Sequence, residues 1–133
     1  MHVQNMIRSH PDVGGNADEA LIRCIELCHD CAQTCTSCAD ACLAEDMVRD
    51  LRQCIRLCLD CADLCTATGA LATRRTGQNV EVLRAILAAC ETACAACAAE
   101  CRHHADMHAH CKICAEVCDA CGGACREALG VVH

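Results

Sequence analysis

The sequence predicts an all-α fold, an antiparallel up-down-up-down four-helix bundle, and three observations favour it. Cysteine recurs in four blocks that share one spacing, C-x3-C-x2-C-x3-C. Alternating steps of 4 and 3 residues are the period of a helix seam packed in a bundle, whereas a strand requires steps of two. Short connections separate the blocks, and short connections join antiparallel neighbours.

The four blocks supply most of the candidate metal ligands. They are Cys24, Cys28, Cys31 and Cys35; Cys54, Cys58, Cys61 and Cys65; Cys90, Cys94, Cys97 and Cys101; and Cys114, Cys118, Cys121 and Cys125. Aliphatic residues stand beside each seam and charged residues lie farther round, so each helix is amphipathic with its Cys stripe at the centre of the buried face. We expect helices of roughly 22–28 residues, or about 33–42 Å.

The elements follow in chain order. Residues 1–17 are expected to form an N-terminal arm or a short helix, and residues 18–133 the Cys-lined bundle. Asn16 and Glu19 resemble a capping box at the start of the first long helix. The connections are expected at residues 43–47, 73–79 and 103–107.

The composition requires an unusual core. The chain has 133 residues, the length of one ordinary domain, with 19 Cys and no Phe, Tyr or Trp. A domain of this size normally builds its core on aromatic and large aliphatic side chains. Here the core must consist of small groups. Either the helices approach one another closely, or something outside the sequence fills the middle.

The sequence argues against several classes of protein. A disulfide scaffold needs an oxidising compartment, but the first twenty residues hold no apolar run typical of an export signal, and an odd number of Cys cannot all pair within one chain. We expect a cytoplasmic protein with reduced thiols and no membrane span. The net charge of −7, the scattered basic residues and the lack of aromatic residues argue against nucleic-acid binding.

The two ends of the predicted bundle differ. In an up-down bundle the first and third connections lie at the same end, and the extra thiols and most His and Met residues map there. These residues are Cys38, Cys42, Cys111, Met47, His103, His104, Met107, His108 and His110. The seams continue toward the other end through Leu21, Thr68, Ala72, Val80, Leu83, Leu87, Ala128 and Val132. We therefore expect a tube of thiols that hydrocarbon closes at one end and His and Met rim at the other.

Thiols in this arrangement favour Cu(I). Cβ atoms one helical turn apart are about 5–6 Å apart, whereas a disulfide needs about 3.5–4.5 Å, so bridges within one helix are strained while bridges across the bundle stay feasible. Two thiolates one turn apart can hold a soft cation between them. Soft thiolate ligands favour Cu(I), which accepts two or three sulfurs.

Charge distinguishes between metals. Burying many unpaired thiolates is prohibitive, and one Cu(I) per thiolate leaves the core neutral. Isolated Zn²⁺ sites with four Cys ligands keep about two negative charges each, and we expect straight helices to lack the turns that let four ligands converge. Without metal the thiols stay protonated, so the bundle can fold empty and release protons as copper enters. We expect about one Cu(I) ion per Cys, with copper entering at the end rimmed with His and Met.

The chain resembles the copper storage protein family, in its cytosolic branch, over about residues 18–128. The resemblance rests on the fourfold Cys motif, the His and Met cluster at 103–110 and the missing export signal. It implies a homotetramer of four-helix bundles that binds many Cu(I) ions through inward-facing Cys, protects the cytosol and holds copper for cuproenzymes. It also implies metal-binding roles at the mouth for His104, His108 and His110. Of these, His104 is the best candidate because it continues the seam three residues after Cys101.

Other interpretations stay open at this point. The thiols could be inert small core residues, and Met47, Met107 and part of the His cluster could fill gaps or face solvent. A general Zn²⁺ or Cd²⁺ buffer and a thiol redox protein are the alternative functions, although redox C-x-x-C pairs usually follow a strand. An iron–sulfur protein is a further alternative, but its cluster needs four converging Cys, and we expect continuous stripes to spread the ligands out instead. No acid–base pair or open metal site suggests an enzyme, and a copper chaperone or a small thiol is the expected copper donor.

Overall fold

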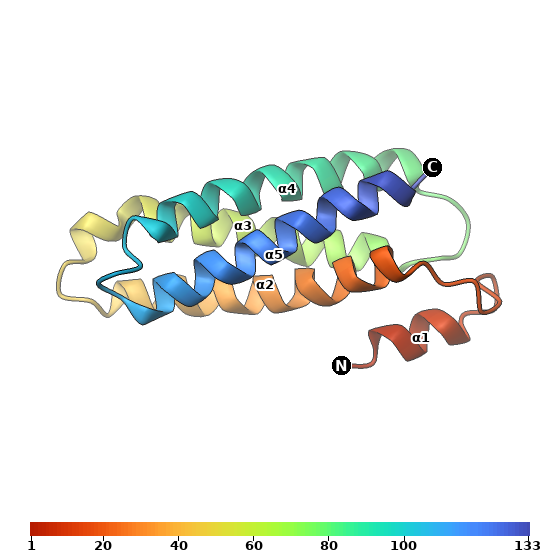
Figure 1. Cartoon of the computed structure of the whole chain (residues 1–133), viewed down its shortest axis with the longest axis horizontal. Helices are drawn as coiled ribbons and strands as arrows, with labels where there is room; N and C mark the ends of the chain where they lie inside the picture. The colour runs from red at the N-terminus through yellow and green to blue at the C-terminus, as the bar shows by residue number, and fades with distance from the viewer.

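The computed structural model describes residues 1–133, and its long helices form the predicted bundle. They are α2 (Glu19–Leu43), α3 (Arg52–Thr73), α4 (Val80–Arg102) and α5 (Ala109–Val131), and each runs antiparallel to the next (Figure 1). α2 packs against α3 and α5, and α4 packs against the same two helices, so the four helices form a ring in chain order. The prediction of an antiparallel up-down-up-down four-helix bundle is confirmed.

The start of α2 differs from the predicted capping box. Asp18 is the N-cap, and its carboxylate accepts hydrogen bonds from the backbone N–H groups of Ala20 at 2.8 Å and Leu21 at 3.3 Å. Asn16 lies two residues too early to cap this helix, and Glu19 is the first helical residue. A carboxylate at this position satisfies free N–H groups and opposes the positive end of the helix dipole.

The three connections lie where the sequence places them. The first turns over residues 44–47 and continues through a short 3-10 helix, η1 (Val48–Leu51), that was not predicted. Leu51 ends this helix and is fully buried, so hydrocarbon anchors the connection to the bundle. The others span residues 74–79 and 103–108. In Figure 1 the first and third connections lie together at one end.

A short N-terminal helix, α1 (Val3–Ser9), precedes the bundle, as the sequence allowed. Ile7 is only 3% exposed and belongs to the same apolar core as the long helices. His10 bonds through Nε2 to the hydroxyl of Thr76 at 3.1 Å, which ties the arm to the connection between α3 and α4. The arm therefore packs against the end of the bundle where α2 begins (Figure 1).

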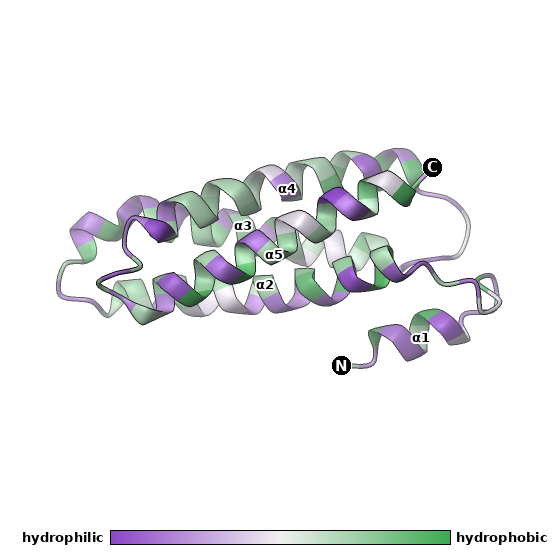
Figure 2. Cartoon of the chain, in the orientation of Figure 1, coloured by the Kyte–Doolittle hydropathy of each residue, from purple (hydrophilic) through white to green (hydrophobic).

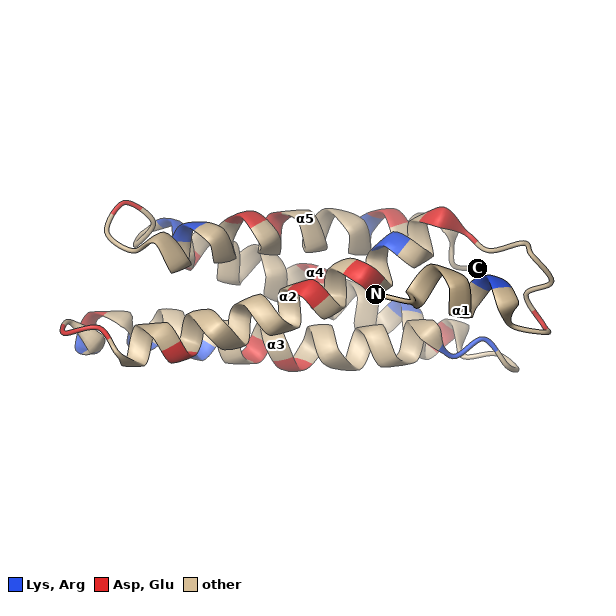
Figure 3. Cartoon of the chain, turned by 90° about the horizontal axis from the view of Figure 1, so that it is seen from below, with Lys and Arg blue, Asp and Glu red and all other residues tan.

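The interior of the bundle consists of thiols and small side chains. Every Cys is at most 1% exposed. The helices approach closely enough that a Cβ added at Gly122 on α5 would lie 3.3 Å from the Cβ of Cys94 on α4. Hydrophilic residues recur along every long helix (Figure 2), and acidic and basic residues are interspersed along the chain (Figure 3). Close approach of the helices thus compensates for the missing aromatic residues.

α4 is long and apolar enough to cross a membrane by length and composition alone. Its most apolar 18-residue window has a mean hydropathy of 1.6, and 33% of that window is buried inside the bundle. Its apolar character comes largely from Ala and Cys residues. A core helix of a bundle can be as long and as apolar as a membrane helix, because both are rich in apolar side chains.

Candidate metal centre

The steps of 4 and 3 residues bring sulfurs from all four long helices to the bundle axis. Along one helix, the Sγ atoms of Cys31 and Cys35 are 3.8 Å apart. Across the bundle, Cys35 Sγ lies 3.5 Å from Cys118 Sγ, and Cys65 Sγ lies 3.6 Å from Cys90 Sγ. A sulfur such as that of Cys35 therefore has neighbours on its own helix and on facing helices, and contacts of this kind join the thiols of all four long helices into one lattice.

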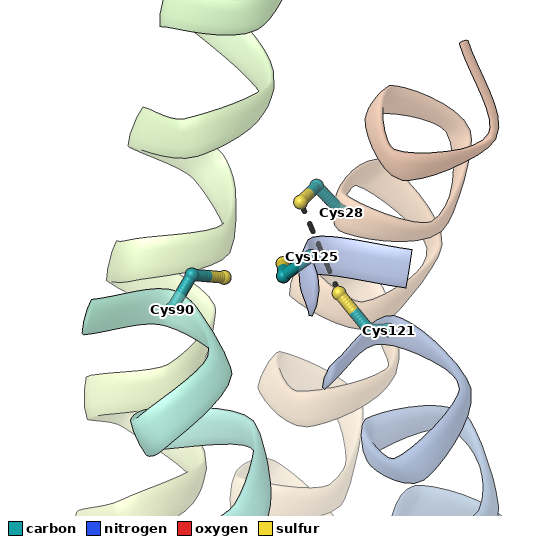
Figure 4. Close-up of side chains that lie close together, drawn as sticks. All are labelled: Cys28, Cys90, Cys121 and Cys125. Carbon is teal, nitrogen blue, oxygen red and sulfur yellow. Dashed lines mark hydrogen bonds between the residues drawn. The ribbon is translucent and has the colours of Figure 1, made fainter. Parts of the chain in front are cut away.

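Sets of four thiols converge within this lattice, with all four Sγ atoms of a set within 4.8 Å of one another. Five of the sets are Cys28, Cys90, Cys121 and Cys125; Cys31, Cys65, Cys94 and Cys121; Cys31, Cys35, Cys61 and Cys118; Cys35, Cys97, Cys114 and Cys118; and Cys38, Cys54, Cys58 and Cys101. Figure 4 shows the first set, in which Cys28 of α2 and Cys121 of α5 lie 3.8 Å apart. Neighbouring sets share members such as Cys121, so a metal in one set borders the next.

The expectation that straight helices cannot bring four thiols together is wrong. Facing helices supply the convergence that turns supply in small zinc domains, as the set containing Cys28 and Cys90 illustrates. The close sulfur pairs lie 3.5–4.0 Å apart. Two metal–sulfur bonds of about 2.3 Å at roughly 110–120° span about 3.8–4.0 Å. The spacing therefore suits a metal held between neighbouring sulfurs, and the sharing of sulfurs favours many ions over isolated sites.

The thiols are free, and burial opposes their ionisation. Burial raises the pKa of Cys42 to about 11, and it also raises the pKa of Cys111. Contacts between thiols raise some pKa values and lower others. The contact with Cys101 raises the pKa of Cys58 and lowers the pKa of Cys54. A cation that binds Cys42 or Cys111 at neutral pH must therefore displace a proton.

At the end with the first and third connections, an imidazole joins the thiols. His110, in the first turn of α5, places Nδ1 3.4 Å from Cys38 Sγ and 3.6 Å from Cys111 Sγ. The ring contacts thiols of two helices at once. It was predicted as a weaker candidate than His104, yet it is the histidine that the structure brings against the sulfurs.

A carboxylate that the sequence analysis missed holds two of the histidines. Glu45 Oε2 lies 2.8 Å from His108 Nδ1 and 2.9 Å from His110 Nε2. The hydrogen bond from His110 lowers the pKa of the Glu45 carboxyl, and the charges of both histidines act in the same sense. Glu45 follows Cys42 by three residues but lies in the turn beyond the end of α2, so its position in the sequence alone gave no sign of these two contacts.

The remaining His and Met residues of this end differ in how far they are exposed to solvent. His104 is 18% exposed, and its Nε2 lies 3.9 Å from the carboxylate of Glu100. His103 and Met107 face solvent, whereas Met47 is half-buried. The structure therefore brings His108 and His110 together and leaves His104 beside them on the adjoining connection.

The opposite end is closed by hydrocarbon, as predicted. Leu83 and Leu87 of α4 are at most 1% exposed, and Thr68 is buried with its hydroxyl donating to the carbonyl of Leu64 at 2.7 Å. Arg84 donates through Nη1 to the carbonyl of Leu129 at 2.8 Å, which satisfies a free carbonyl near the C-terminus of α5. The thiol lattice therefore ends against a plug of aliphatic side chains.

Known proteins share this fold and much of this sequence. The profile of the copper storage protein family matches residues 17–130. A copper storage protein from Streptomyces lividans, in a structure loaded with 10 copper equivalents, is 55% identical with a TM-score of 0.92, over 96% of this chain and 98% of that one. A structure of a cytosolic copper storage protein from the same organism, with five coppers, is 56% identical with a TM-score of 0.84, over 86% of this chain and 96% of that one.

A more distant relative has the same architecture. Metal-free copper storage protein 3 from Bacillus subtilis is 36% identical with a TM-score of 0.66, over 80% of this chain and 96% of that one. No curated protein sequence matches the chain. The family profile covers most of the chain, and the Streptomyces protein matches it nearly from end to end. The chain belongs to the copper storage protein family.

Proposed function

We propose that this protein is a high-capacity store for Cu(I), which it binds through thiolates inside the four-helix bundle. The observation that carries the proposal is the lattice of 19 buried free thiols, in which neighbouring sets share sulfurs. A store needs many equivalent soft ligands, and shared sulfurs let ions lie close together without isolated charged sites. The family and the copper-loaded relatives support this function.

The expected capacity is many ions, about one Cu(I) per Cys. Each Cu(I) that replaces one thiol proton leaves the charge of the core unchanged, so filling the interior does not accumulate buried charge. A Zn²⁺ or Cd²⁺ buffer would place two positive charges at each site, and continuous sharing of sulfurs fits that charge poorly. A thiol redox role has no support in the comparisons, and we propose that the protein is not an enzyme.

We propose all 19 Cys as ligands, with His104, His108 and His110 as ligands at the open end. Copper is proposed to enter at this end, where His110 meets Cys38 and Cys111. A groove of about 320 Å³ between α2 and α5 leads to the same place, and its lining includes Cys38 and His110. One other groove, between α4 and α5, is lined in part by Cys118, and another lies against Leu21 at the plugged end, but neither is lined by a histidine.

The setting of the protein is also a proposal. We propose a cytoplasmic location, in line with the cytosolic Streptomyces relative, without binding to nucleic acid or membrane. We further propose assembly as a homotetramer, and delivery of copper by a copper chaperone or a small thiol. Stored copper would protect the cytosol and remain available for cuproenzymes. Residues 1–17 are proposed as an arm appended to the bundle of residues 18–133.

Anaerobic titration tests the proposal. The reduced protein is titrated with Cu(I) and then with Zn²⁺ against a competing chromogenic chelator, and helicity is followed by circular dichroism. We expect tight Cu(I) uptake near the thiol count of 19 with little change in helicity. Saturation at one to four Cu(I), or preferential retention of Zn²⁺, contradicts storage of Cu(I).

A further inference from the structure

Glu45 joins two of the connections at the open end. It lies in the turn that follows α2, whereas His108 is the N-cap residue of α5 and His110 lies in its first turn. One carboxylate oxygen, Oε2, is within hydrogen-bond distance of a nitrogen on each ring. The two rings stack with centroids 5.4 Å apart and an angle of 15° between their planes.

An ionised carboxylate only accepts hydrogen bonds, so both ring nitrogens that face it must carry hydrogen. In the neutral form each imidazole then has its hydrogen on the nitrogen toward Glu45 and its lone pair on the other nitrogen. For His110 the hydrogen is on Nε2 and the lone pair is on Nδ1. For His108 the hydrogen is on Nδ1 and the lone pair is on Nε2.

One of these lone pairs faces two thiols, and the other lies on a buried nitrogen that no protein group satisfies. Nδ1 of His110 faces the sulfurs of Cys38 and Cys111 at 3.4 Å and 3.6 Å. Nε2 of His108 is buried and has no hydrogen-bond partner. A buried nitrogen without a partner is costly in a folded protein, and an unfilled ligand position is one reason for such a nitrogen.

We infer that Glu45 is a positioning residue that fixes the tautomers and orientations of His108 and His110, so that both offer a lone pair to the first Cu(I) ions. The inference rests on the proposed function of the open end and adds a group that touches no metal itself. A carboxylate hydrogen-bonded to the far nitrogen of a metal-binding imidazole raises its basicity and holds its plane.

The chain offers a matched control for Glu45. Glu100 also lies at the open end and contacts histidines, with Oε2 3.2 Å from His103 Nδ1 and 3.9 Å from His104 Nε2. It does not contact a ring that faces the thiols. The variants Glu45→Ala and Glu100→Ala therefore remove the same group from the same end, and only the first is expected to disturb the rings beside Cys38 and Cys111.

The first readout is the tautomer of each ring in the metal-free protein, from ¹⁵N chemical shifts in long-range ¹H–¹⁵N spectra. We expect hydrogen on Nε2 of His110 and on Nδ1 of His108, and loss of this pattern in Glu45→Ala but not in Glu100→Ala. The second readout is the affinity for the first Cu(I) equivalents, which we expect to fall about 10-fold in Glu45→Ala alone, with unchanged total capacity and helicity.

The inference is overturned if the metal-free wild type has the opposite tautomers, or if Glu45→Ala keeps the wild-type tautomers and the wild-type affinity for the first equivalents. Its outcome is separate from that of the storage proposal. A wild-type protein that shows the expected tautomers yet binds only a few Cu(I) ions contradicts storage and leaves the role of Glu45 in place.

Discussion

The two ends of the bundle continue the same helical seams with opposite chemistry. At the plugged end the seam positions carry side chains such as Leu83 and Leu87, which are buried and apolar. At the open end they carry Cys42 followed by Glu45, with His110 packed alongside. The geometry of the bundle alone therefore does not distinguish the two ends of the tube. The residue types at the ends distinguish them.

The plugged end stabilises the fold, whereas the open end gives copper access to the thiols. Burial of aliphatic side chains stabilises the plugged end, and the arm packs against that end through Ile7. The open end has little hydrocarbon apart from Leu51, and hydrogen bonds to Glu45 hold its connections together. We therefore expect substitutions in the plug to change the free energy of unfolding, and substitutions at the rim to change copper uptake.

The largest effect is expected for Leu87→Ala. Leu87 is fully buried in the plug, so its loss leaves a cavity and should lower the free energy of unfolding of the metal-free protein by about 2–5 kcal/mol. Chemical denaturation measures this change. Leu59→Ala is the control, because Leu59 is 46% exposed and its loss should cost less than about 0.5 kcal/mol. Copper uptake slowed by Leu87→Ala as strongly as by a rim substitution contradicts the separation.

The converse effect is expected for His110→Ala. Loss of the ring that faces Cys38 and Cys111 should slow uptake of the first Cu(I) equivalents about 10-fold, while the free energy of unfolding changes by less than about 1 kcal/mol. Stopped-flow mixing with a Cu(I)–chelator complex measures the rate. His103→Ala serves as the comparison, since His103 is 74% exposed and should leave the rate unchanged. Equal rates for the two variants remove His110 from the path of copper.

Alkaline pH is expected to have a smaller effect, on the stability of the metal-free protein. The pKa of Cys42 rises from its ordinary 9.0 to about 11 in the folded protein because of burial, so above pH 9 the unfolded chain loses this proton first. Fewer protons bound in the unfolded state mean that stability falls as pH rises. The metal-free protein should thus become less stable between pH 9 and about 11.

Copper loading should remove this dependence, because a copper-bound sulfur has no proton to lose. Denaturation of the metal-free and loaded forms at several pH values measures the difference, and Cys42→Ala should reduce the slope of the metal-free form. An equal slope in both forms shows that the buried thiols are not its source.

The smallest effect on stability is expected midway between the two ends, where α5 packs against α4. A Cβ at Gly122 would meet the Cβ of Cys94 at 3.3 Å, whereas a Cβ at Gly123 has no atom within 4 Å. Gly123→Ala should therefore stabilise the protein by about 0.5–1 kcal/mol through helix propensity, and Gly122→Ala should lose this gain to crowding. Thermal unfolding of both variants provides the test. A larger gain in stability from Gly122→Ala than from Gly123→Ala would show that α4 and α5 can move apart to accept the added methyl group.

The sequence predicts the bundle well because a repeated spacing leaves little choice. Sixteen Cys in one phase define four buried faces, and the polar breaks between them define the connections, so the positions of Cys24 or Cys90 follow without knowledge of tertiary contacts. Local chemistry at the ends was harder to predict. Asp18 was missed as the N-cap of α2 because Asn16 and Glu19 also suit a capping box.

Contacts between distant segments were beyond the reach of the sequence. His104 was preferred over His110 because it continues the seam of α4, yet α4 ends at Arg102 and the His104 ring lies beside Glu100. Glu45 lies 65 residues from its partner His110, and only the packing of α2 against α5 brings the two together. The convergence of four thiols likewise depends on facing helices.

The central claim is that Cu(I) replaces thiol protons one for one inside a neutral core. Proton release measured during anaerobic Cu(I) loading in weak buffer, with native mass spectrometry on the same samples, tests it most directly. We expect one proton released per Cu(I) bound until the number of ions approaches the 19 thiols. Uptake that ends at a few ions, or that proceeds without matching proton release, contradicts the claim.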